Sequence, residues 1–516
     1  MKVVGRSKTA RPVYYPTHYY MSTETKKKVI VIGAGFAGLS TASLLAKEGH
    51  HVTMLEKNDQ AGGRARIWEK DGFRFDMGPS WYWMPDVFES YFNLFGKKVS
   101  DFYHLQRLDP GYRIYYEEGE YLDIPASMPE LEELFESLEP GSAKHLKEFM
   151  KQAAYKYEVG MSDYVFRPSH SILEYMDIRL LVESFRIQMF QSLSSHVRKH
   201  FSHPKLVKML EFPVLFLGGT PETTPAMYSM MNHADLALGT WYPEGGMNEI
   251  VKAMVKVAED QGVEIKLSHE VQKIEVKGKK AKAVHTSQGV FEADAVVAGS
   301  DYEHTDQRLL DPEHRTYSEK YWEGRTMSPS SLLFYLGVNK KLDNIKHHSL
   351  FFDEDFQQHA REIYANPQWP SKPLFYASST SQTDSTVAPA GGENLFFLMP
   401  LAPGLEDSEE MRERYYDIMM ERFERHIGQS VRDSVVVKRS YAMEDFEKDY
   451  HSFKGNAYGL ANTLLQTAFL KPKMRSKKVN NLYYAGQLTV PGPGVPPSLI
   501  SGQVAAREVH KYLQGG

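Results

Sequence analysis

Three glycines near the N-terminus have the spacing that could hold the phosphates of a dinucleotide. Gly33, Gly35 and Gly38 form a GxGxxG pattern directly after the apolar run at 29–32. The first glycine makes a tight turn, the second lets the backbone approach a pyrophosphate, and the third lets a helix and a strand pack closely. Glu56 follows at the distance expected of an acid that accepts hydrogen bonds from both ribose hydroxyls.

Two buried strands and a helix must position these glycines. Residues 29–32 are apolar, β-branched and uncharged, which is typical of a strand buried on both faces. A helix of small residues is expected over 39–47, and a second strand over 51–55 ends next to Glu56. A bound phosphate would then lie against the free N–H groups at the start of the helix. The alternative is a glycine turn that has this spacing by chance.

Gly62, Gly63 and Arg64 follow soon after Glu56, in the order E-K-N-D-Q-A-G-G-R-A. A nicotinamide-binding domain does not need this segment. The region resembles the FAD-binding motif of flavin oxidoreductases in the amine oxidase and carotenoid desaturase superfamily. The resemblance implies FAD as the cofactor, with this segment beneath the flavin and Arg64 neutralising phosphate charge.

A stiff loop near the C-terminus could complete the site. Gly486 follows an apolar strand at 481–485, and four prolines and two glycines fill residues 491–497. Proline fixes the backbone, so a loop of this kind before a helix could present N–H donors to the flavin pyrimidine and stabilise charge on it. The alternative is an ordinary stiff surface loop.

This C-terminal segment is similar to that of the bacterial and fungal phytoene desaturase family, and the resemblance extends to residues 71–80, 242–247 and 299–305. Gln487 stands where many flavoproteins have an acid, which favours carotenoid desaturases over amine oxidases. The implied cofactor-binding residues are Gly33, Gly35, Gly38, Glu56, Lys57, Gly63, Arg64, Gly78, Pro79, Ser80, Val271, Asp301, Gly486, Gln487, Val495 and Pro496. Val271 could meet the adenine or be a plain strand residue, and Asp301 could reach the flavin edge or cap a helix.

We therefore expect an α/β fold of the amine oxidase-like superfamily, in which α+β substrate-domain inserts interrupt a discontinuous Rossmann-type FAD-binding domain. That domain would comprise 26–116, 241–303 and 476–516. A helical insert at 117–240 would face the substrate or a membrane, and an insert at 304–475 would bind substrate. Residues 1–25 are expected to be a disordered extension.

Periodicity predicts further elements within these parts. The expected helices cover 248–261, 408–427 and 498–513, with helical spacing also over 131–138. The expected strands cover 263–267, 269–276, 291–298, 331–338 and 394–400.

Composition sets limits on the chemistry. The chain has 516 residues, enough for two or three domains, and no cysteine, which excludes disulfides and thiol chemistry. A net charge of −5 gives no argument for a nucleic-acid partner. Neither an apolar run long enough to span a membrane nor a signal peptide is apparent. The sequence gives no indication of the oligomeric state.

Candidates for other chemistry are few. His233 and Asp235 are proposed to handle protons, although most lone histidines are surface or core groups. The aromatic run 81–83 could line an apolar cavity or belong to the core. The apolar run 212–217 could be core, part of a hydrocarbon channel or a membrane-facing surface. His347 and His348 have no partners at ligand spacing, so no metal is assigned.

The family resemblance implies a C40 polyene substrate such as phytoene, desaturated towards lycopene. FAD would accept a hydride, and the delocalised cation left behind would lose a proton without needing a strong base. Binding would come from buried hydrocarbon, so we expect a cytoplasmic protein that docks on the inner face of the cell membrane and passes electrons to quinone or oxygen. The alternatives are a carotenoid 3,4-desaturase, isomerase or ketolase, an amine oxidase, and a non-enzymatic prenyl-binding protein.

Overall fold

The computed structural model describes residues 26–117, 119–171, 174 and 186–515. The extension expected at 1–25 lies outside these ranges. Within them, none of the helices combines the length and apolar character that crossing a membrane requires.

A five-stranded parallel sheet joins segments that are far apart in the sequence. Its strands, in spatial order, are β19 (Leu482–Tyr484), β13 (Ala295–Ala298), β1 (Lys28–Ile32), β2 (His51–Leu55) and β9 (Glu264–Lys266). All four residues of β13 and four of the five in β1 are buried, as expected of a parallel sheet covered on both faces. The discontinuous Rossmann-type sheet predicted from the sequence is therefore confirmed.

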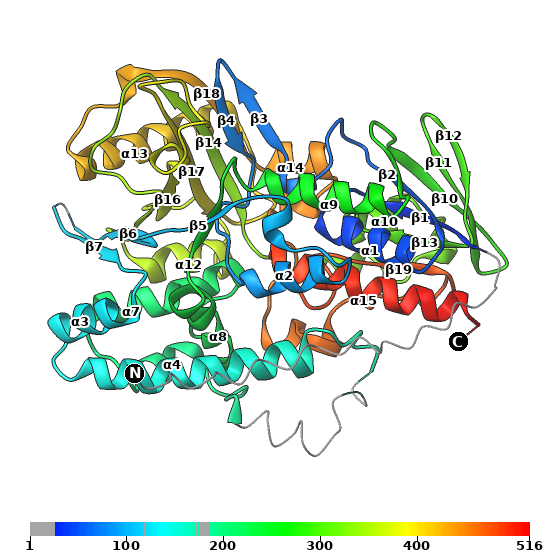
Figure 1. Ribbon diagram of the computed structural model, residues 1–516, viewed down its shortest axis with the longest axis horizontal. Coiled ribbons are helices and arrows are strands. Elements are labelled where there is room, and N and C mark those ends of the chain that lie inside the picture. The colour runs from blue at the N-terminus through cyan, green and yellow to red at the C-terminus, as the bar shows by residue number, and fades with distance from the viewer. Residues whose placement is uncertain (1–25, 118, 172–173, 175–185, 516) are drawn as a thin grey trace, which may run out of the picture.

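Three helices pack together beside this sheet (Figure 1). They are α1 (Phe36–Lys47), α9 (Asn248–Asp260) and α15 (Val495–Leu513). Helix α1 contacts both of the others. Its contact with α15 is close, because a Cβ atom at Gly502 would lie 2.3 Å from the Ala37 carbonyl oxygen, and Thr41 Oγ1 donates to the Gly502 carbonyl at 3.0 Å.

A seven-stranded mixed sheet forms the other large part of the molecule. In spatial order its strands are β18 (Val435–Tyr441), β14 (Ser330–Val338), β17 (Glu393–Leu401), β16 (Phe375–Ser378), β15 (His348–Phe351), β6 (Tyr112–Tyr115) and β7 (Tyr121–Ile124). Helix α13 (Glu409–Ile427) shares an apolar core with one face of this sheet (Figure 1). Strand β6 lies before the domain boundary predicted at 116, yet it pairs with β15 of the predicted substrate-binding insert, so this sheet includes residues from both sides of the boundary. The rest of the predicted division into domains stays a prediction.

Smaller elements connect and flank these two sheets. Helices α3 (Met128–Leu138), α4 (Ser142–Val159), α6 (Leu193–Val197), α7 (Pro204–Glu211) and α8 (Met230–Asn232) lie in the region predicted to be a helical insert. Strands β10 (Val271–Lys277), β11 (Lys280–Thr286) and β12 (Gly289–Glu292) form an antiparallel sheet. Hairpin β3–β4 (Ile67–Lys70, Phe73–Asp76), strands β5 (Leu105–Arg107) and β8 (Trp241–Pro243), and helices α2 (Pro85–Asn93), α10 (Tyr302–Arg308), α11 (Glu319–Glu323), α12 (Phe356–Tyr364) and α14 (Met443–Tyr450) complete the named elements.

Three predicted elements are corrected by the structure, and the first is helix α1, which begins at Phe36 and not at residue 39. The single strand expected over 291–298 is two strands, β12 and β13, in different sheets. Helix α15 begins at Val495, three residues earlier than predicted, because Pro496 and Pro497 lie in its first turn, where a missing N–H leaves no hydrogen bond unmade.

Candidate functional site

A cavity of about 360 Å³ lies where the predicted cofactor-binding segments meet. Every predicted cofactor-binding residue except Gly38 lines it. Gly38 has a packing role instead, because a Cβ atom there would lie 1.9 Å from the Gly33 carbonyl oxygen. The three segments that were predicted to converge therefore do so around one space.

The glycine loop leaves room for a ligand close to its backbone. Gly33 has a φ of +92°, a conformation that side chains disfavour. A Cβ atom at Gly35 would have no protein atom within 4 Å, so it would extend into the cavity. Gly63 lies opposite, its own Cβ position 3.4 Å from the Gly35 Cα atom. These backbones form a cradle that an added side chain would fill.

Glu56 is held firmly at the wall of the cavity. Its Oε2 accepts a hydrogen bond from the Ala34 N–H at 2.7 Å, and its Oε1 accepts one from the Asn58 N–H at 2.9 Å. The side-chain amide of Asn58 also donates to Oε1, at 3.1 Å, so Oε2 is the oxygen that keeps a second lone pair for a ribose hydroxyl.

Arg64 brings a positive charge into the same space. Its Nη2 donates to Ser452 Oγ at 2.8 Å and to the Asn456 carbonyl at 3.1 Å, and the guanidinium lies 5.0 Å from the centre of the Tyr450 ring. Its buried Nε has no hydrogen-bond partner among the described residues. Loss of hydration lowers the pKa of this guanidinium. A cation with an unused donor at the cavity fits a phosphate group.

Asp301 caps a helix, which is one of the two roles that the sequence left open, and its approach to the flavin edge stays a prediction. It accepts hydrogen bonds from the backbone N–H groups of His304 and Phe453, at 3.2 and 3.3 Å, and so caps helix α10. It also lines the cavity, and burial raises its pKa to about 6. Val271 likewise both begins strand β10 and lines the cavity.

The C-terminal loop closes one side of the cavity. Gly486 and Gln487 line it, and so do residues 493–498, which lead into α15. The start of this 19-residue helix therefore faces the space, where its dipole favours negative charge. The Gly486 N–H donates to Ser501 Oγ of the same helix at 2.9 Å, which fixes the loop against the helix.

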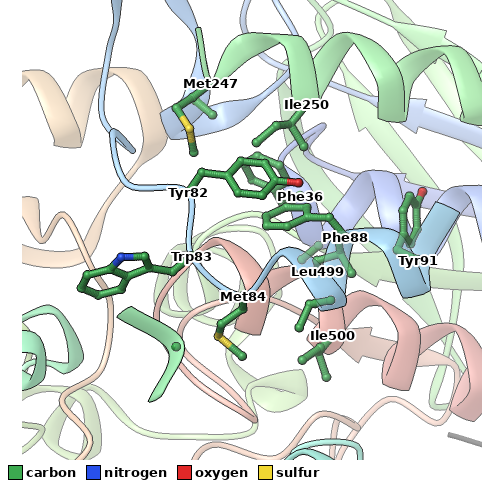
Figure 2. Close-up of a cluster of buried hydrophobic side chains, with 14 of the residues drawn as sticks. Phe36, Tyr82, Trp83, Met84, Phe88, Tyr91, Met247, Ile250, Leu499 and Ile500 are labelled. Atoms are coloured by element: carbon green, nitrogen blue, oxygen red, sulfur yellow. The ribbon is translucent and has the colours of Figure 1, made fainter. Parts of the chain in front are cut away.

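The aromatic run at 81–83 divides between cavity and core. Trp81 and Trp83 line the cavity. Figure 2 shows Tyr82 directed towards Phe36 and Phe88 in the apolar core, whereas Trp83 points to the other side of the chain. Both sequence interpretations therefore apply, each to different members of the run.

A second, apolar space of about 70 Å³ adjoins the cavity. Tyr376, Leu398 and Tyr458 line both spaces. Most of the remaining wall is aliphatic or aromatic: Phe212, Pro329, Leu350, Phe352, Phe356, Ala360, Ile363, Leu374, Phe375 and Pro400. The sequence indicated only Phe212 here, because the other residues come from separate strands and helices that only the fold brings together.

His233 and Asp235 are not among the residues that line either space. Asp235 accepts hydrogen bonds from the hydroxyl groups of Tyr112 and Thr240, at 2.8 and 3.2 Å, and burial raises its pKa to about 7. His233 lies beside the Tyr157 ring, with ring centroids 5.3 Å apart. Their predicted role in proton handling gains no support from these positions.

Comparison with known proteins agrees with this geometry. Residues 36–510 match the family described as flavin containing amine oxidoreductase. The chain is 41% identical over 488 residues to a carotenoid 3,4-desaturase of Haloarcula japonica, covering 94% of this chain and 98% of that protein. It is 28% identical to a zeta-carotene-forming phytoene desaturase of Myxococcus xanthus, covering 95% of each. A putative protoporphyrinogen oxidase of Exiguobacterium shares the fold, with a TM-score of 0.60 at 14% identity over 95% of this chain and 99% of that one.

Proposed function

The chain belongs to the flavin containing amine oxidoreductase family, and within it to the carotenoid desaturases, and from this membership we propose that it introduces a double bond into a C40 carotenoid. The proposal is supported by an apolar, aromatic space that adjoins the cofactor cavity and shares Tyr376, Leu398 and Tyr458 with it. An amine substrate would need acidic or polar groups there, whereas a hydrocarbon needs only apolar surface.

FAD is the cofactor, and the residues present fit it. The Gly33–Gly35 backbone and Arg64 would hold the pyrophosphate, Glu56 the ribose, and the loop at 486–497 the flavin ring. When bound, FAD supplies hydride acceptance. The contribution of the protein is to orient the polyene, exclude water and remove a proton.

The position of the new double bond has two candidates. The 41% identity to a carotenoid 3,4-desaturase, over nearly the whole of both chains, favours the 3,4 position. Desaturation of phytoene towards lycopene is the second candidate, supported by the 28% identity to a phytoene desaturase.

A substrate panel separates these candidates. Cells that make phytoene, lycopene or a carotenoid lacking only the 3,4 double bond would express the chain, and their pigments would be resolved by chromatography and mass. We expect a product two hydrogens lighter from the last of these. Conversion of phytoene alone would favour the second candidate, and no change in any pigment would refute the proposal.

Peripheral docking on the inner face of the cell membrane, from the cytoplasm, is part of the proposal because the substrate dissolves in lipid. Two exposed leucines support it: Leu465 and Leu470 are 79% and 41% exposed. Three exposed cations, Arg475, Lys477 and Lys478, follow in the sequence and suit anionic headgroups. Quinone or oxygen is the proposed electron acceptor.

A further inference from the structure

A chain of three hydrogen-bonded groups leads from the cavity to a buried histidine. The Tyr376 hydroxyl donates to Ser80 Oγ at 3.1 Å and lies 2.6 Å from His348 Nδ1. Ser80 and Tyr376 line the cavity, whereas His348 is fully buried behind them. The polar chain therefore starts at the wall of a space that is otherwise mainly apolar on this side.

The fold explains why these groups meet. His348 and Tyr376 lie on the neighbouring antiparallel strands β15 and β16, where His348 is opposite Ser378 and thus two residues from Tyr376, on the same face. Ser80 comes from the segment that follows β4, far away in the sequence. Sequence inspection could not join them.

His348 is held in position but retains an unused nitrogen. Its ring stacks on Trp81, with centroids 4.1 Å apart and planes inclined by 9°. Its Nε2 has no hydrogen-bond partner among the described residues. Burial lowers the pKa of His348 well below its usual value, so the imidazole is neutral before reaction and is a weak base, which suffices for the acidic C–H bond beside a carbocation.

We propose that Ser80, Tyr376 and His348 form the route by which the substrate loses its proton. This inference rests on the proposed desaturase function and supplies a residue set for the step that His233 and Asp235 were predicted to perform. Ser80 is the group that would touch the substrate, and His348 acts through Tyr376 as a positioning residue and final acceptor.

A carbon that has given up a hydride to the cofactor becomes cationic, and a C–H bond on the neighbouring carbon breaks. Its electron pair forms the new double bond, and the proton passes to Ser80 Oγ. The proton of Ser80 passes to Tyr376, and that of Tyr376 passes to His348 Nδ1, which leaves an imidazolium. The relay uses the neutral His348 tautomer that carries its proton on Nε2, so that Nδ1 accepts from Tyr376, and both hydroxyl groups rotate to donate towards the histidine.

Tyr364, Tyr458 and His359 are the other titratable groups at the apolar end, and both ring nitrogens of His359 are used in hydrogen bonds with the Pro400 carbonyl and the Leu374 N–H. The remaining histidines of the cavity wall lie elsewhere. His304 and His451 stack on each other, with centroids 4.0 Å apart, and His451 Nε2 lies 2.7 Å from Glu270 Oε1. His451 lines the wall together with Glu270 and Val271, near Glu56, where the adenosine part of the cofactor is expected. Proton loss from the polyene at the opposite, apolar side needs a separate route.

The test compares Tyr376→Phe and Ser80→Ala with Tyr415→Phe in the FAD-bound protein. Tyr415 is the matched control, because its hydroxyl is also buried and hydrogen-bonded, to the Pro370 carbonyl at 2.7 Å, but does not line the cavity. The protein is mixed in liposomes, without oxygen, with the carotenoid that the native chain desaturates. Product formed in a single turnover, FAD content and the solvent deuterium isotope effect are measured.

We expect both cavity variants, compared with the native chain at saturating FAD, to form product at least about 10-fold more slowly, since acid–base groups contribute 10²-fold or more. The native protein and Tyr415→Phe should show a solvent isotope effect, and Tyr376→Phe should not. A purely structural role of Tyr376 would leave the isotope effect in place. Product formation at the native rate in either cavity variant would overturn the route while leaving the desaturase function intact. If the native protein converts no carotenoid, it is the proposed function that fails.

Discussion

Gly35 and Gly38 lie one helical turn apart but have different surroundings. The position of a Cβ atom is open at Gly35 and blocked by the Gly33 carbonyl oxygen at Gly38. The φ of −78° at Gly35 also suits alanine. We predict that Gly35→Ala leaves the melting temperature of the FAD-free protein unchanged but weakens FAD binding at least about 10-fold. Gly38→Ala should lower both the melting temperature of the FAD-free protein and the affinity for FAD. Equal losses of stability in the two variants would contradict these different roles of the two glycines.

Arg64 and Arg66 differ in whether a carboxylate pairs with their charge. Arg66 is paired with Asp449 at 2.5 Å, whereas Arg64 has no carboxylate within ion-pair distance in the described part of the chain. We predict that Arg64→Met weakens FAD binding about 100-fold, worth about 2.7 kcal/mol, without destabilising the FAD-free protein. Arg66→Met should destabilise the FAD-free protein by about 3 kcal/mol, because it leaves a carboxylate unpaired. Urea unfolding with and without FAD measures both effects.

Asp235 gives a prediction about pH. Its folded pKa of about 7 exceeds the ordinary 3.8, so the stability contributed by the neutral carboxyl is complete below pH 3.8 and is lost as the pH rises to about 7. Three pKa units correspond to about 4 kcal/mol. The unfolding free energy of Asp235→Asn, relative to that of the native chain, should therefore rise by up to about 4 kcal/mol between pH 4.5 and pH 8. Product formation should be the same in both proteins. A stability difference independent of pH would show that the carboxyl does not titrate as described.

At the scale of elements, the α1–α15 contact links the two ends of the cofactor site. Helix α1 carries the glycine loop and α15 follows the C-terminal loop, so their spacing sets the width of the cavity. We predict that Gly502→Ala costs about 3 kcal/mol of unfolding free energy, because its Cβ atom would overlap the Ala37 carbonyl. Lys511 is exposed on the same helix, and Lys511→Ala should change the unfolding free energy by less than about 0.5 kcal/mol. A small effect at Gly502, measured by urea unfolding, would mean that the helices can separate freely.

Elements with strong local signals could be predicted from the sequence. The βαβ unit at 28–55 and helix α9 have clear periodicity and glycine or acidic boundaries, and the structure has them within three residues of the prediction. Strands β12 and β13 were merged because Ala293 and Asp294, which separate them, carry no turn signal. The apolar end of the cavity and the Ser80–Tyr376–His348 chain depend on strand pairing between distant segments, which no local pattern reveals.

At the scale of the whole molecule, the parts built on the two large sheets, which Figure 1 shows next to each other, both contribute to the walls of the two adjoining cavities. The parallel sheet supplies the phosphate-binding loop, and the mixed sheet supplies the apolar wall through β14, β16 and β17. The cofactor and the proposed hydrocarbon substrate can therefore meet where these two parts adjoin.

Membrane docking is tested on the intact protein. We predict that the native chain sediments with phosphatidylserine-containing liposomes at low salt, and that the double variant Leu465→Glu with Leu470→Glu stays in the supernatant. Val290→Glu is the control, because Val290 is also apolar and 60% exposed but lies on β12. Native protein recovered entirely in the supernatant would remove membrane docking from the account.

The most direct test of desaturation is anaerobic mixing of the FAD-bound protein with carotenoid in liposomes. We predict that the yellow flavin absorbance disappears and that one carotenoid product, two hydrogens lighter, forms for each flavin reduced. Flavin that stays oxidised with every carotenoid but is reduced by a polyamine would contradict the account.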